Sequence, residues 1–79
     1  MSHLSVLRFS YPDERRARVV ERSVGVEVGE IDDERSQASV EREGNTVEVR
    51  VEATDLVALR AGINSWTRMV AVAERLAAR

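Results

Sequence analysis

The side chains that catalysis most often uses are scarce in this chain of 79 residues. There is a single histidine, His3, and no cysteine, so neither a Cys–His pair nor a set of thiolate ligands can form. No serine lies in a Gly-x-Ser-x-Gly elbow, the turn that exposes the nucleophile of many hydrolases. The run Asp32-Asp33-Glu34 could bind a cation weakly, but neighbouring acidic residues in a loop are usually only solvated. We therefore predict that the chain is not an enzyme and holds no metal ion and no cofactor.

Four polar residues near the C-terminus are spaced to share one stripe of a helix, and they are suited to phosphate: Arg60, Asn64, Arg68 and Arg75. Arginine can make two parallel hydrogen bonds to a phosphate group, and such contacts position a nucleic acid without reading its sequence. The alternative interpretation is a solvated helix face. Because so few phosphate contacts are available, RNA binding by this chain alone should be weak and sensitive to salt.

The pattern in the first half of the chain predicts a strand followed by a short helix. Residues 3–11 are rich in strand-forming types, with Ser5, Leu7, Phe9 and Tyr11 on one face and Leu4 and Val6 on the other, which predicts a strand with one well-buried side. Pro12 ends this strand, and Asp13 is suited to cap a helix over residues 14–24, since its carboxylate can accept hydrogen bonds from the first-turn amides. We expect Gly25 to end that helix in the left-handed conformation.

The second half reads as a hairpin followed by a long helix. An acidic connection, residues 25–35, leads to strands at 36–43 and 46–53, and Gly44-Asn45 between them suits a two-residue hairpin turn. A helix over residues 56–78, capped by Thr54 or Asp55, ends the chain. The sequence thus predicts one α+β domain over residues 1–79, β-α-β-β-α, with a three-stranded antiparallel sheet and two helices packed on one face, an arrangement like that of KH domains.

The long C-terminal helix carries more apolar surface than one sheet face can cover. One stripe is expected to enter the core: Leu56, Leu59, Ile63, Trp66, Val70, Ala73 and Ala77. A second, adjoining band holds Ala58, Ala61, Ser65, Met69, Val72 and Leu76. Together they span an arc of roughly 200°, about twice the width that packing on one sheet requires. Left in water, the second band would be a patch of the kind that marks interaction sites.

Two explanations of the second band stay open at this point. The first helix could cover part of it with Val19, Val20 and Val24. Its apolar stripe is narrow, however, so we predict that a helix of another protein completes the coverage. The residues expected at this partner interface are Val19, Ala58, Ala61, Ser65, Met69, Val72 and Leu76.

The short length of the chain also favours a partner. A domain of this size buries only about 60–65% of the surface of its unfolded form, and such domains often need a disulfide, a metal or a second chain. We therefore expect a homodimer, formed by pairing of edge strands or by packing of helices. No segment approaches the ~20 apolar residues of a membrane span, and the N-terminus lacks the features of a signal peptide. We expect a cytoplasmic location and no membrane association.

The last strand and helix contain a moderately specific motif, Glu52-Ala53-Thr54-Asp55-x-x-Ala58-Leu59-Arg60-x-x-x-Asn64-Ser65-x-x-Arg68. It resembles the signature of the small dimerising subunit of the KEOPS complex, the Pcc/CTAG antigen family. The upstream order is also similar, from the strand that ends at Phe9-x-Tyr11-Pro12 to the Gly44-Asn45 hairpin. The resemblance covers essentially the whole chain.

This resemblance implies a non-catalytic role in tRNA modification. In the family, the subunit forms a homodimer and packs its two helices against the threonylcarbamoyl transferase subunit of KEOPS. It also helps to hold the tRNA in which threonylcarbamoyladenosine is formed. Carried over, Thr54 and Asp55 match the helix-capping pair, and Arg60, Asn64 and Arg68 match polar positions that contact tRNA or the partner. The chain departs from its relatives in having no lysine, and the acidic loop adds negative charge, so strong tRNA binding by the subunit alone is not expected.

A second reading is an independent RNA-binding module of KH-like topology. It is disfavoured because the chain has no Gly-x-x-Gly loop of the kind that clamps the nucleic-acid backbone. Aromatic residues for base stacking are also few, since Phe9 and Trp66 are expected in the core. The two readings are separable, because only the second predicts tight RNA binding by the isolated protein.

Overall fold

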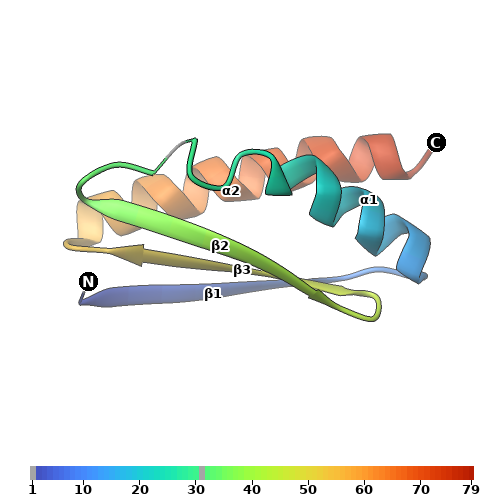
Figure 1. Cartoon of the computed structure of the whole chain (residues 1–79), viewed down its shortest axis with the longest axis horizontal. Helices are drawn as coiled ribbons and strands as arrows, with labels where there is room; N and C mark the ends of the chain where they lie inside the picture. Colours follow the sequence, from blue (N-terminus) through green and yellow to red (C-terminus); the bar gives the residue numbers. More distant parts are fainter. Residues whose placement is uncertain (1, 31) are drawn as a thin grey trace.

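Five elements follow one another in the predicted order, β-α-β-β-α, in a computed structural model that describes residues 2–30 and 32–79. They are β1 (His3–Ser10), α1 (Glu14–Gly25), β2 (Ser36–Glu43), β3 (Thr46–Ala53) and α2 (Leu56–Ala77). Both helices lie on one face of the sheet, and the other face is open (Figure 1). The predicted α+β fold is therefore confirmed.

The sheet has β3 in its centre, with the order β1-β3-β2 and antiparallel pairing throughout. In one cross-strand row Leu7 pairs with Val49, which pairs with Val40. Because side chains alternate between the two faces of a strand, this row faces the helices, and the neighbouring row of Arg8, Glu48 and Glu41 faces the open side. The inward residues of β3 are the most enclosed, with exposed fractions of 0–1% at Val47, Val49, Val51 and Ala53. The two edges of the sheet are β1 and β2.

The Gly44-Asn45 turn joins β2 to β3 as expected, and Glu43 pairs with Thr46 across it. Gly44 has a φ of 60°, whereas Asn45 has no positive φ. This pattern of signs is that of a type II′ turn, in which only the first central residue needs a left-handed backbone. Asn45 also ties the turn to the end of β1, since its Nδ2 donates to the Tyr11 carbonyl at 2.8 Å and its carbonyl accepts from the Tyr11 amide at 2.9 Å.

Carboxylate caps begin both helices, as predicted. The Asp13 side chain accepts from the Arg16 amide at 2.8 Å, and Asp55, rather than Thr54, accepts from the Ala58 amide at 2.8 Å. The expectation for Gly25 was wrong, because the residue has no positive φ. The chain continues from α1 in right-handed turns, in which the Glu27 amide donates to the Val24 carbonyl, so the left-handed position is delayed to Gly29, with a φ of 86°.

The core lies between the sheet and the two helices. From α2 it takes Trp66, Val70, Ala73 and Ala77, all at most 2% exposed, and from α1 it takes Ala17, Val20 and Val24. The expectation that Leu56 is a core residue was wrong, since its side chain is 54% exposed. Because α2 begins where the three strands end, at the His3–Ala53–Ser36 row, its first residue has no sheet beneath it. Ala58 is buried there instead, at 8% exposure.

No helix in the described part of the chain is both long enough and apolar enough to cross a membrane. Among the same residues, no group of three or more His, Asp or Glu side chains is arranged to hold a metal ion.

Candidate functional site

The second apolar band of α2 is divided between the protein interior and the solvent. Ala58 is buried and Met69 is half-buried against the core. Val72 is 53% exposed and Leu76 is 46% exposed. Ala61 and Ser65 are also exposed, whereas Val19 on α1 is half-buried and packs against the core. The predicted interface residues therefore do not all share one free surface: the large apolar ones that are exposed are Val72 and Leu76.

These two residues line a hollow of about 310 Å³ between α1 and α2. Its floor is apolar, and three polar residues stand at its rim. The full lining is Ser23, Val24, Glu27, Arg68, Met69, Val72, Ala73 and Leu76. The first helix thus leaves the C-terminal half of the band open, because Val24 is directed into the core and Ser23, the next residue toward the groove, is too short to cover Val72.

A second, smaller hollow of about 120 Å³ continues along the same flank of α2. On the helix side it is lined by small residues, Ala61, Gly62 and Ser65, together with Trp66. On the other side lie Asp32, Asp33 and residues 36–38 at the start of β2. The glycine is required here: a Cβ at Gly62 would lie 2.7 Å from Cγ1 of Val51, so the close approach of α2 to β3 depends on its absence.

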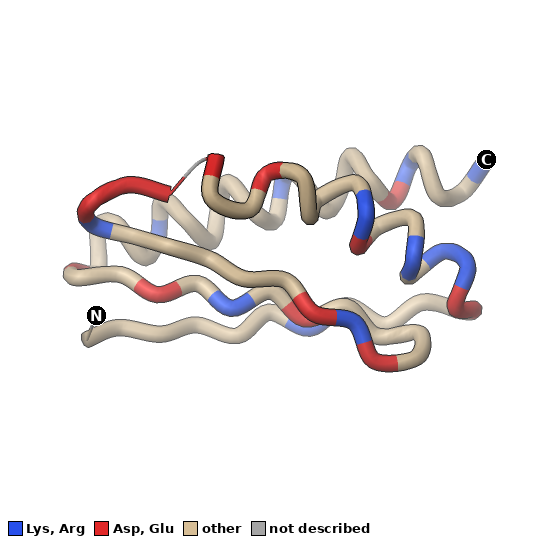
Figure 2. The backbone as a smooth tube through the Cα atoms, viewed as in Figure 1, with Lys and Arg blue, Asp and Glu red and all other residues tan. Residues whose placement is uncertain are grey.

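The arginine stripe is exposed on α2, as helical spacing predicts. Arg60, Asn64, Arg68 and Arg75 are all exposed, and within the described residues none of the three arginines has a carboxylate at ion-pair distance. Five other arginines do have one: Arg8, Arg16, Arg35, Arg42 and Arg50. Arg68 of the stripe also lines the larger hollow. Figure 2 shows the basic residues spaced along α2 and the acidic run of the 26–35 connection beside the start of this helix.

A clamp between Arg35 and Asp55 holds the acidic connection against the start of α2. Nε of Arg35 donates to Oδ2 of Asp55 at 3.1 Å, and its Nη2 donates to Oδ1 at 2.9 Å. This guanidinium, with the Ala58 amide, holds the pKa of Asp55 well below its usual range, and the carboxylate in turn raises the pKa of Arg35. Sequence reasoning assigned Asp55 to the cap and missed Arg35, because nothing in the local pattern pairs residues so far apart in the chain.

Two further contacts hold the C-terminal half of α2 in place. The Tyr11 hydroxyl donates to Oε2 of Glu74 at 2.9 Å, and partial burial together with this carboxylate raises the pKa of Tyr11. Nη2 of Arg15 donates to the Ala77 carbonyl at 2.8 Å, which satisfies a backbone group at the helix end. These contacts fix the part of α2 that presents Val72 and Leu76.

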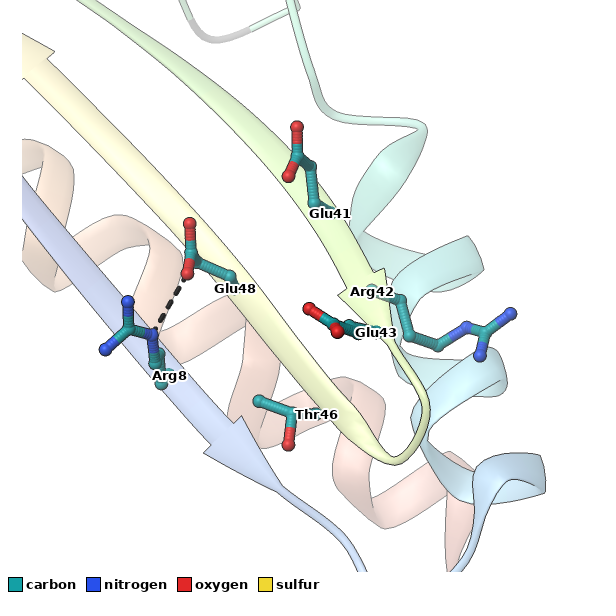
Figure 3. A pocket seen from close by; sticks show the side chains of 6 residues that line it. All are labelled: Arg8, Glu41, Arg42, Glu43, Thr46 and Glu48. Carbon is teal, nitrogen blue, oxygen red and sulfur yellow. Dashed lines mark hydrogen bonds and ion pairs between the residues drawn. The ribbon is translucent and has the colours of Figure 1, made fainter.

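The open face of the sheet carries a depression of about 650 Å³ lined by Arg8, Glu41, Arg42, Glu43, Thr46 and Glu48 (Figure 3). Arg8 and Glu48 form an ion pair across β1 and β3 at 3.0 Å, which lowers the pKa of Glu48. Arg42 turns away from this face and pairs with Glu21 of α1 at 2.9 Å. The side chains that line this depression are thus charged or polar, from all three strands of the sheet. The apolar residues on this face are Leu4, 51% exposed, and Val6, 36% exposed, both on the edge strand β1.

Comparisons with known proteins agree with this geometry. Residues 5–78 match the model of the family described as "Transcription factor Pcc1". No curated protein sequence matches the chain at a significant level. Among solved structures, a chain of the crystal structure of a binary Gon7-Pcc1 complex is similar, with a TM-score of 0.83, 19% identity, and coverage of 95% of this chain and 91% of that one. At that identity the structural likeness shows the fold, while the family match extends over almost the whole sequence. This chain is therefore a member of the Pcc1 family, as the motif in its last strand and helix predicted.

Proposed function

We propose that the chain is the small dimerising subunit of a KEOPS complex and supports formation of threonylcarbamoyladenosine in tRNA without catalysing it. The observation that carries this proposal is the exposed apolar flank of α2 around Val72 and Leu76, in a chain of the Pcc1 family. A lone protomer has no element left to cover that flank, since all five elements of the described structure are already packed. The simplest way to remove this apolar flank from water is to bind it to another protein.

The proposed partner is the threonylcarbamoyl transferase subunit of KEOPS, bound through a helix laid beside α2. The hollow between α1 and α2 has the shape for this, because an amphipathic helix places its apolar side chains into such grooves at intervals of three and four residues. The similar chain found in a Gon7-Pcc1 complex supports a role in assembly with other proteins.

A second copy of the chain is the proposed partner at the sheet edge β1. This strand has eight residues, a single charged side chain, Arg8, and the exposed Leu4 and Val6. Native proteins protect free edge strands with charges, bulges or covering elements, and β1 has little of this protection. The opposite edge, β2, carries Glu41, Arg42 and Glu43 instead. Of the two modes of dimerisation that the sequence allowed, pairing of β1 strands is therefore the one that the exposed residues favour.

The proposed contribution to tRNA is weak positioning by the exposed stripe Arg60, Asn64, Arg68 and Arg75. These side chains have no carboxylate partners within the described residues, which leaves their guanidinium groups available. Because the number of phosphate contacts is small, the contribution should become appreciable only when dimerisation and the transferase add further contacts.

Replacing Val72 by aspartate tests the partner interface. Co-expression with the transferase subunit followed by co-purification should recover a complex with the wild-type chain and lose it with Val72→Asp, since a charge would be buried in an apolar groove. Met69→Asp should act in the same way, although Met69 also contacts the core. Thr67→Asp is the matched control, because this exposed residue of α2 lines neither hollow. Retention of the complex by Val72→Asp in a folded protein would refute the proposal.

The KH-like RNA-binding module remains the alternative function, and titration of RNA into the isolated protein separates it from the proposal. An independent module would bind RNA at sub-micromolar concentration at physiological salt. We expect a flat titration, because the free arginines are few and the connection 26–35 is strongly acidic.

A further inference from the structure

The two hollows beside α2, which we name together the trough, have charged residues of opposite sign on their two sides. They follow each other along the helix, since Ser65 in the smaller hollow and Met69 in the larger are one turn apart. The charged residue on the α2 wall is Arg68. On the facing wall the charged lining residues are all carboxylates: Glu27 at the larger hollow, and Asp32 and Asp33 at the smaller one. One wall is therefore positive and the other negative.

The acidic wall is held in place by its own hydrogen bonds. Oδ1 of Asp33 accepts from the amides of Arg35 and Ser36 at 2.7 and 2.9 Å, and Oδ1 of Asp32 accepts from the Ala38 amide at 3.0 Å. Two backbone hydrogen bonds hold Glu27: its amide donates to the Val24 carbonyl at 3.0 Å, and its carbonyl accepts from the Glu30 amide at 3.1 Å. The carboxylates thus stand on an ordered backbone.

The two walls do not neutralise each other. Arg68 and Glu27 line the same hollow, yet within the described residues neither is in an ion pair. Elsewhere on α1 the same types of side chain do meet, since Arg42 and Glu21 are 2.9 Å apart. The opposite charges at the larger hollow therefore line it without reaching ion-pair distance of each other.

We propose that the trough selects an amphipathic helix of stated charge pattern: carboxylates along the edge that meets α2, and lysine or arginine along the edge that meets Glu27, Asp32 and Asp33. This inference rests on the proposed function, in that the helix belongs to the transferase subunit. Charges beside an apolar seam set the partner and its orientation in coiled coils in the same way. A helix rotated about its axis so that like charges meet would bind more weakly, and this difference in affinity gives the trough its specificity for one helix orientation.

The acidic wall also decides between the two possible ligands of Arg68. A nucleic-acid backbone entering the trough would bring phosphates against three carboxylates, which repel it. A protein helix can satisfy both walls at once. Arg68 is thereby assigned to the partner helix in the complex. This narrows the part of the stripe proposed to face tRNA to Arg60, Asn64 and Arg75, which line neither hollow.

Titration calorimetry with the transferase subunit of the same genome tests this assignment. We expect Arg68→Glu to weaken binding roughly three- to tenfold at about 50 mM salt, because the attraction between Arg68 and the carboxylates of the partner helix becomes a repulsion. This loss of affinity should be smaller at about 500 mM salt, where screening is strong. The combined Glu27→Gln, Asp32→Asn and Asp33→Asn variant keeps its hydrogen-bond acceptors and should weaken binding to a similar extent. Arg18→Glu, on the exposed side of α1 away from both hollows, is the matched control and should bind like the wild type.

The outcomes separate this inference from the proposed function. In one outcome Val72→Asp abolishes binding, while Arg68→Glu and the carboxylate variant bind like Arg18→Glu. The trough would then bind the partner without selecting its charge pattern, and the inference is overturned. If Arg68→Glu instead lowers tRNA affinity and leaves transferase affinity unchanged, it is overturned in favour of RNA. If Val72→Asp itself binds normally, the proposed function fails and the inference with it.

Discussion

At the scale of single residues, Gly62 and Asp55 set the position of α2 by different means. Gly62 lets the helix approach β3 closely, because no side chain separates it from the buried Val51. Asp55 satisfies the first-turn amide of Ala58 and also accepts two hydrogen bonds from Arg35, so one carboxylate caps the helix and anchors the acidic connection. Both residues therefore act on the trough without lining the apolar floor of its larger hollow.

Replacing Gly62 by alanine should destabilise the protein. The new Cβ would overlap Cγ1 of Val51, which is branched, buried and unable to move aside. Overpacking of this kind costs about 1–3 kcal/mol, of which the better helix propensity of alanine returns up to about 1 kcal/mol. Urea unfolding should report a lower free energy. Gly25→Ala is the control: its Cβ meets no atom within 4 Å, so stability should be unchanged or slightly higher, and equal losses in both variants would contradict the close-packing argument.

Asp55 should give the stability a distinct dependence on pH. Arg35 and the Ala58 amide lower the pKa of this carboxyl in the folded state, so the unfolded chain binds its proton first as the pH falls. The stabilisation is therefore present above the unfolded pKa of about 4 and is lost as the pH falls toward the folded value. Urea midpoints measured across this acidic range should fall more steeply for the wild type than for Asp55→Asn. Parallel curves for the two proteins would contradict the role given to the Arg35–Asp55 clamp.

At the scale of elements, β1 and α2 present different kinds of free surface. β1 offers unpaired backbone groups along one side, with Leu4 and Val6 beside them. α2 offers side chains only, since its backbone groups are satisfied within the helix and at its caps. A strand edge is suited to pairing with an identical strand, whereas a helix flank is suited to another helix. The two surfaces can thus serve a second copy and a different partner at the same time.

Replacing Val6 by lysine should disrupt the dimer. Val6 lies at the centre of β1, so two β1 strands paired antiparallel about a central two-fold axis bring the two Val6 residues near each other. Two lysines there would repel and would also replace buried apolar contact. We expect the dissociation constant to rise roughly tenfold or more, as measured by sedimentation at several concentrations. Ser39→Lys is a matched control, because Ser39 occupies the same cross-strand row as Val6 at the other sheet edge, with Arg50 between them. Loss of the dimer in Ser39→Lys alone would place the interface on β2.

At the scale of the whole molecule, the elements and their order could be predicted from local patterns. Alternation located the strands, Gly44-Asn45 located the hairpin, and the two aspartate caps located the helix starts, because each of these depends on neighbours within a few residues. The wrong expectations, at Gly25 and Leu56, both fall at helix ends. At a helix end the local pattern is compatible with several backbone conformations and several degrees of burial. Contacts with distant parts of the chain determine which of them is adopted.

What the sequence alone determined is that α2 has more apolar surface than the sheet can cover, since that is a property of helical spacing. Which part of the surplus stays exposed was decided only by the tertiary structure. Burial of Ala58, the close approach at Gly62 and the short reach of Ser23 leave the opening at Val72 and Leu76. The charged walls of the trough likewise arise only on folding. The packing of α2 beside a connection far from it in the chain brings Arg68 and Glu27 to the larger hollow, and Asp32 and Asp33 to the smaller one.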